Sequence, residues 1–102
     1  MNQTATEGRL PGEDLVRQGL ADLTENRLTD CALLVLIAAP RLRRLGFKIE
    51  DRPNSQPWEH ALYDRLAGQL GAAAHSHYNS LIRRIVSYAH ALEREQSEAA
   101  RG

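Results

Sequence analysis

The sequence predicts an all-α fold, a small antiparallel bundle of four main helices, and three observations support this prediction. The length of 102 residues, with 42% apolar and 25% charged residues, is that of one ordinary globular domain. Apolar residues recur at steps of three and four, which is the spacing of amphipathic helices. Glycine, proline and asparagine lie between the periodic segments, where helices usually begin or end. We therefore expect a single helical domain over residues 12–95, between a flexible arm at 1–11 and a flexible tail at 96–102.

The first helix is expected at about residues 12–25. Glu13 and Asp14 put negative charge in its first turn, where negative charge favours the helix dipole. The apolar residues at helical spacing in this segment are Leu15, Val16, Leu20 and Leu23. Asn26 follows them and can take the left-handed conformation that ends many helices.

The second helix is expected at about residues 30–45, either kinked or split at Pro40. The nine residues from Cys31 to Ala39 are all apolar, and a buried strand is the alternative interpretation of this run. Only two of the nine are β-branched, which favours the helix. Because this helix has no polar face, either the connection at 47–57 or a second copy of the chain must cover its outer side.

Two further helices are expected at about residues 57–70 and 73–95. Pro57 suits the first position of a helix, and Gly71 marks the point where that helix ends. The residues that mark the buried sides are Trp58, Leu62, Leu66 and Leu70 in the first, and Tyr78, Leu81, Ile82, Ile85, Tyr88, Ala89 and Leu92 in the second.

Charge and composition narrow the classes of function. Thirteen basic and thirteen acidic residues cancel, so the chain lacks the overall positive charge of a typical nucleic-acid-binding domain. The longest apolar run is too short to cross a bilayer, and the first twelve residues lack the apolar stretch of a signal peptide. The single cysteine, Cys31, fits a reducing compartment. We therefore expect a cytoplasmic protein that is not bound to a membrane.

A polar stripe along the last predicted helix is the main candidate for chemistry. Its residues follow one another at steps of three or four and are Ser76, Asn79, Ser80, Arg83, Ser87, His90 and Arg94. Arg83 and His90 lie two turns apart, so a guanidinium that stabilises phosphate charge and an imidazole that moves a proton share one face. The alternative is that the stripe is the solvated face that every amphipathic helix has.

The stretch from Arg83 to His90 resembles the motif of the HEPN ribonucleases, in which an arginine and a histidine, separated by a few residues, lie near the start of a late helix. The match covers eight residues at the loosest spacing of the motif and lies here in the middle of the predicted helix. The resemblance implies a helical bundle that pairs as a dimer and cuts RNA without a metal. If the chain is an enzyme, we expect Arg83, His90 and Asn79 to be its catalytic residues.

Basic residues around Pro40 are a second candidate site. The expected binding residues for a phosphate group or an acidic partner are Arg41, Arg43, Arg44, Arg83 and Arg84. The alternative is that Arg43 and Arg44 favour the dipole at the end of their own helix.

No metal site and no cofactor are expected. His75 and His77 are two positions apart, so on a helix their side chains point in nearly opposite directions. The chain has neither a second cysteine nor a His-x-x-x-His pair, and it lacks a glycine-rich phosphate loop.

These observations together favour a small helical interaction protein over an enzyme. We expect it to associate as a homodimer and to bind another macromolecule without catalysis. One alternative is a metal-independent ribonuclease that uses Arg83 and His90. The other is a nucleic-acid-binding module that uses Arg41, Arg43 and Arg44.

Overall fold

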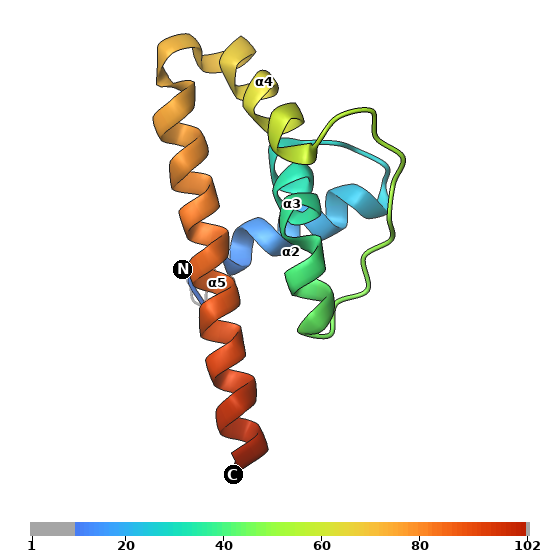
Figure 1. Cartoon of the computed structure of the whole chain (residues 1–102), viewed down its shortest axis with the longest axis vertical. Helices are drawn as coiled ribbons and strands as arrows, with labels where there is room; N and C mark the ends of the chain where they lie inside the picture. The colour runs from blue at the N-terminus through green and yellow to red at the C-terminus, as the bar shows by residue number, and fades with distance from the viewer. Residues whose placement is uncertain (1–9, 102) are drawn as a thin grey trace, which may run out of the picture.

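The computed structural model describes residues 10–101, and this part of the chain is helical without any strand (Figure 1). Its elements in order are α2 (Glu13–Thr24), α3 (Asp30–Arg44), α4 (Trp58–Leu70), the 3-10 turn η1 (Gly71–Ala73) and α5 (Ala74–Arg101). The prediction of an all-α fold is confirmed. Most of the expected N-terminal arm lies outside the described residues.

Helix α5 ends later than expected, and α3 excludes one of the two courses expected at Pro40. Pro40 does not split α3, which continues through it because Ala39 and Leu42, on either side of the proline, are both buried in the core. The last helix continues to Arg101 instead of ending at residue 95. Gln96 supports this extension, because its side-chain amide donates to the backbone oxygen of Leu45 at a distance of 2.9 Å. The flexibility of the tail stays a prediction.

The helices do not all lie alongside one another (Figure 1). Helix α3 packs against α2, α4 and α5 and forms the centre of the fold. Helices α4 and α5 run antiparallel, whereas α2 lies across α3 and α5, and the end of α5 projects beyond the other helices. The structure therefore supports a compact helical fold, and an antiparallel four-helix bundle is not confirmed.

Two glycines allow α2 to cross its neighbours closely. Gly12 has a φ of 78°, and a Cβ atom there would lie 2.5 Å from the backbone oxygen of Arg84 on α5. A Cβ atom at Gly19 would lie 2.5 Å from Cγ2 of Val35 and would overlap the backbone oxygen of Cys31, both on α3. The crossing of α2 thus depends on two positions that have no side chain.

The core lies around α3. The largest fully buried side chains are Val16, Leu34, Val35, Leu42, Leu62 and Leu66. In the apolar run of α3, residues 32–36 and Ala39 are buried by the other helices and by Ile49 of the connection after α3. Ile37 and Ala38 remain half-buried. The rest of the same chain therefore covers most of this helix, and a second copy is not needed for that purpose.

A buried carboxylate fixes the turn between α2 and α3. The side chain of Asp22 accepts hydrogen bonds from the Thr29 hydroxyl, the Gln18 amide and the Arg27 guanidinium. The Thr29 hydroxyl also accepts a hydrogen bond from the backbone N–H of Ala32 and so caps the start of α3. Every polar atom of this buried group therefore has a partner, as burial requires.

This carboxylate makes the stability of the fold depend on pH. The hydrogen bond from Thr29 is the main cause that lowers the pKa of Asp22, and burial opposes it. The folded protein therefore binds this proton more weakly than the unfolded chain, in which an aspartate has a pKa of about 3.9. The ionised Asp22 therefore stabilises the fold fully above the unfolded-state pKa of about 3.9. This stabilisation is lost as the pH falls through the lower pKa that Asp22 has in the folded state.

In the variant Asp22→Asn we expect lower stability at neutral pH and a weaker dependence of the unfolding free energy on pH below about pH 5. Urea unfolding at a series of pH values measures both quantities. Asp51→Asn is the control, because the side chain of Asp51 is 94% exposed although it pairs with Arg43. An Asp22→Asn variant with the same pH dependence as the parent protein would contradict the assignment.

Candidate functional site

An apolar groove lies between α3 and α5. Its volume is about 260 Å³, and Ile37, Ala38 and Pro40 of α3 line it together with Ile82, Ile85, Val86 and Ala89 of α5. Val86 is 38% exposed, while Ile37, Ala38 and Ile82 are half-buried. The groove is therefore a continuous apolar surface that the chain itself leaves partly open.

Charged side chains border this groove. The guanidinium of Arg41 on α3 binds both carboxylate oxygens of Glu93 on α5, at 2.8 and 2.9 Å. This hydrogen-bonded ion pair lowers the pKa of Glu93 and raises that of Arg41. Arg44 also lines the groove and is exposed. The pair thus connects α3 and α5 beside the groove, and the nearby charge of Arg44 adds to the lowering of the Glu93 pKa.

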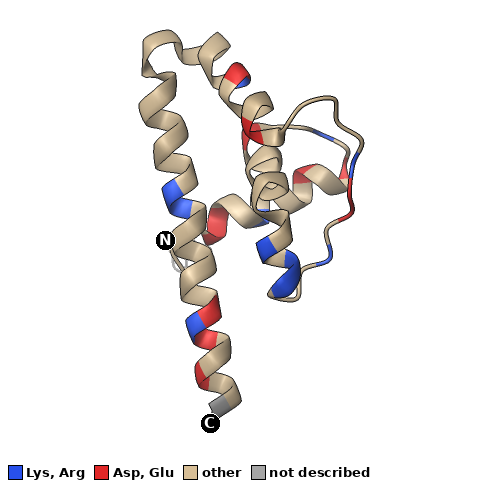
Figure 2. Cartoon of the chain, in the orientation of Figure 1, with Lys and Arg blue, Asp and Glu red and all other residues tan. Residues whose placement is uncertain are grey.

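Basic residues lie in the middle of α5, and its last third carries three glutamates together with Arg94 (Figure 2). Arg83 and Arg84 lie in the middle of the helix, whereas Glu93, Glu95 and Glu98 make its last third mainly acidic. Arg84 pairs with Asp14 of α2 at 3.3 Å. None of these residues lines the groove, whose charged lining residues are Arg41 and Arg44 of α3.

The structure places the expected catalytic residues on the outer surface of α5. Arg83 and His90 are exposed, and within residues 10–101 neither forms a hydrogen bond or an ion pair. Asn79 is half-buried, and its side-chain nitrogen Nδ2 lies 3.2 Å from the His75 ring nitrogen Nε2. None of the three lines the groove. They therefore share a helix but no cavity.

The expected basic site is largely occupied by internal contacts. Besides the pairing of Arg41 and Arg84, the Arg43 guanidinium donates to the backbone oxygen of Ile49 at 2.7 Å and to Asp51 at 2.9 Å. Only Arg44 and Arg83 of the five expected residues lack such partners within the described part of the chain. These contacts reduce the positive charge that a phosphate group would meet.

Histidine and cysteine residues do not gather into a site in the described part of the chain. No group of three His, Cys, Asp or Glu side chains in residues 10–101 is arranged to hold a metal ion. His75 packs against the ring of Tyr63, with ring centres 6.3 Å apart. Burial raises the pKa of the Cys31 thiol, which lowers its reactivity at neutral pH.

The groove was not predicted, although one feature of the sequence indicates it. Val86 belongs to neither the predicted buried side of the last helix nor its polar stripe. Together with the half-buried Ile82 it widens the apolar side of α5 beyond the part that faces the core. An apolar side that is wider than the core requires is a mark of a second contact surface.

Within residues 10–101, no helix combines the length and the apolar character that a membrane span requires.

No protein-family model matches the sequence, and no curated protein or solved structure shows significant similarity to the chain.

Proposed function

We propose that the protein is a self-associating helical interaction protein and that two copies pair through the groove between α3 and α5. The observation that carries this proposal is the continuous apolar surface formed by Ile37, Ile82 and Val86. Single exposed apolar side chains are common on protein surfaces, but a continuous patch bordered by charged residues is typical of a contact surface. A cytoplasmic location and binding of a further macromolecule without catalysis are parts of the same proposal.

The composition of the groove favours a second copy as its occupant. A two-fold axis brings the same surface of both copies together, so that surface must complement itself. The groove combines an exposed side chain, Val86, with the small side chains of Ala38 and Ala89, which leave space for the Val86 of a partner.

Charge supports the same arrangement. If the two α5 helices cross in antiparallel directions, the basic middle of one helix lies toward the acidic end of the other. Arg83 of each copy then lies toward the region of Glu98 in its partner, and attraction between opposite charges favours this orientation.

The variant Val86→Lys tests this proposal. We expect the parent protein to sediment as a dimer, and we expect the variant to associate at least about tenfold more weakly, because its ammonium group would be buried in an apolar contact. Sedimentation velocity over a range of protein concentrations measures the association. The fold should persist, because Val86 is already 38% exposed.

Leu70→Lys is the matched control. Leu70 is 41% exposed and lies at the end of α4, away from the groove, so this substitution should leave association unchanged. A parent protein that remains monomeric at concentrations on the order of 100 µM would contradict the proposal. So would equal weakening by the two lysine variants.

The two alternatives have less support. A ribonuclease that uses Arg83 and His90 needs a site that holds RNA against both side chains, and both lie on an exposed helix face outside the groove. A nucleic-acid-binding surface at Arg41, Arg43 and Arg44 has two of its three guanidinium groups engaged within the chain.

A further inference from the structure

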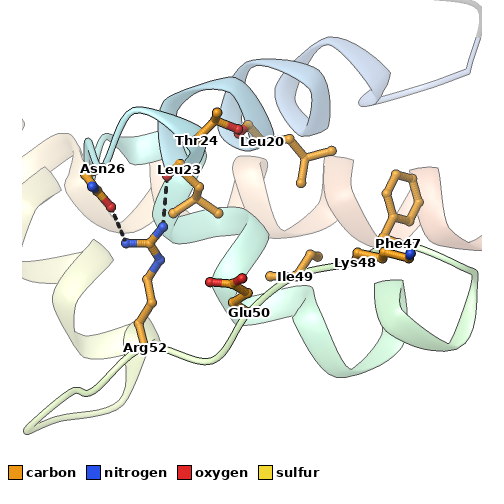
Figure 3. A pocket seen from close by; sticks show the side chains of 9 residues that line it. All are labelled: Leu20, Leu23, Thr24, Asn26, Phe47, Lys48, Ile49, Glu50 and Arg52. Carbon is orange, nitrogen blue, oxygen red and sulfur yellow. Dashed lines mark hydrogen bonds between the residues drawn. The ribbon is translucent and has the colours of Figure 1, made fainter.

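A second cavity lies between α2 and the connection that follows α3, and it shares no residue with the groove. Residues 46–57, here called the strap, pass the C-terminal end of α2 and leave a cavity of about 540 Å³ (Figure 3). Cavities of about 300 to 1,000 Å³ are typical of small-molecule sites. Its size therefore suits a small metabolite.

Hydrogen bonds hold the strap in place on both sides of this cavity. The backbone N–H of Phe47 donates to the Leu42 oxygen at 3.1 Å. At the other end, the Arg52 guanidinium donates to the backbone oxygen of Leu23 at 2.9 Å and to the side-chain oxygen of Asn26 at 3.2 Å (Figure 3). The cavity is thus a fixed part of the fold, and the Arg52 side chain closes one end of it.

The inner wall of the cavity is apolar. Leu20 and Leu23 of α2 lie opposite Phe47 and Ile49 of the strap (Figure 3). Leu23 and Ile49 are buried, and Phe47 packs against the ring of Tyr88 with ring centres 6.4 Å apart. This wall offers a binding surface to an aliphatic or aromatic group.

The rim of the cavity carries one uncommitted charge of each sign. Lys48 and Glu50 are exposed, and neither has a hydrogen bond or an ion pair to any residue in the range 10–101. Helix α2 also ends at this cavity, but the Arg52 guanidinium on the Leu23 carbonyl offsets the negative end of its dipole, so Glu50 is the source of negative charge at the rim. The rim therefore favours an ammonium group near Glu50 and a carboxylate near Lys48.

We infer that this cavity binds a free apolar α-amino acid. Its side chain lies against Leu20, Leu23, Phe47 and Ile49, its carboxylate pairs with Lys48, and its ammonium group pairs with Glu50. A neutral apolar molecule would leave both charges without partners, and a simple carboxylic acid or amine would satisfy only one of them. The zwitterion is the small ligand that complements both of these exposed charges.

Three probes that share one phenyl ring test this inference. L-Phenylalanine carries both charges, 3-phenylpropionate carries only the carboxylate, and phenethylamine carries only the ammonium group. We expect saturable binding of phenylalanine, measured by shifts of backbone amide signals in NMR titrations, with the changes centred on the strap and the end of α2. Each of the other probes should bind about three- to tenfold more weakly, because it lacks one charged contact.

Two neutral variants separate the roles of the charges. Lys48→Gln should weaken the binding of phenylalanine and phenylpropionate and leave the binding of phenethylamine unchanged. Glu50→Gln should weaken the binding of phenylalanine and phenethylamine and leave the binding of phenylpropionate unchanged. Both side chains are exposed, so neither substitution threatens the fold. Glu59→Gln is the matched control: Glu59 is exposed on α4 and lines neither the cavity nor the groove, so this variant should bind all three probes like the parent protein.

The inference is overturned if phenylalanine shows no saturable binding, or if it binds no better than 3-phenylpropionate. It is also overturned if Lys48→Gln and Glu50→Gln bind phenylalanine as tightly as the parent. Because the groove contains none of these residues, each of these results leaves the proposed self-association standing, and a monomeric protein would leave the amino-acid site standing.

Discussion

Replacing Gly19 with alanine is expected to destabilise the fold by about 3 kcal/mol, at the upper end of the usual effect of overpacking a core. The added methyl group would overlap the backbone oxygen of Cys31 and lie 2.5 Å from Val35 Cγ2. A flexible side chain can turn away from such a contact, but the backbone of α3 cannot. Helix α2 would have to move away from α3, and apolar contacts along the whole crossing would weaken.

Gly68→Ala is the control for this substitution. Gly68 lies within α4, and apart from the adjoining backbone of its own helix no atom lies within 4 Å of the position that its Cβ would occupy. Alanine there should leave stability unchanged or raise it by up to about 1 kcal/mol, because alanine favours helix more than glycine does. Urea unfolding of both variants at one protein concentration gives the comparison. Equal unfolding free energies for the two variants would show that the helices do not cross as closely as the structure indicates.

The variant Leu66→Ala is expected to lose about 2 to 5 kcal/mol of stability, the range typical of leucine truncation in a core. Leu66 of α4 is fully buried in the cluster around α3, so truncation of its side chain leaves a cavity in the core. For a domain of about 100 residues, 3 kcal/mol is a large part of the total of about 5 to 15 kcal/mol. The melting temperature should therefore fall by more than about 10 °C.

Leu70→Ala tests whether burial is the cause. Leu70 lies one turn further along α4 and is 41% exposed, so the same change should cost less than about 1 kcal/mol. Calorimetry of the two variants beside the parent measures the difference. Similar losses at both positions would mean that α4 does not present Leu66 to the core.

Much of the secondary structure follows from local sequence patterns. Steps of three and four residues locate α2, α4 and the start of α5, because each of these helices buries one side. The end of α5 does not follow from such a pattern, because residues 97–100 are exposed and show no apolar periodicity. The continuation of α3 through Pro40 depends on burial of Leu42, which only the tertiary fold provides.

The arrangement of the helices and the sites was less accessible to sequence analysis. The crossing of α2 depends on which backbone lies opposite Gly19, and one sequence does not show this. Arg41 was expected to bind a partner, but it pairs with Glu93, which lies 52 positions away along the chain. Both cavities form between segments that are distant in sequence. The wide apolar side of α5 around Val86 was the one sign of the groove, and no pattern within a single segment indicated the cavity beside α2.

The buried Asp22 also bears on the order in which the chain folds. Its partners Gln18, Arg27 and Thr29 lie four, five and seven positions away. Closing such short loops costs little chain entropy. The contact between Arg41 and Glu93 closes a loop of 52 positions and costs more. The corner between α2 and α3 is therefore the part of the molecule best suited to form as a nucleus, onto which α4 and α5 condense later.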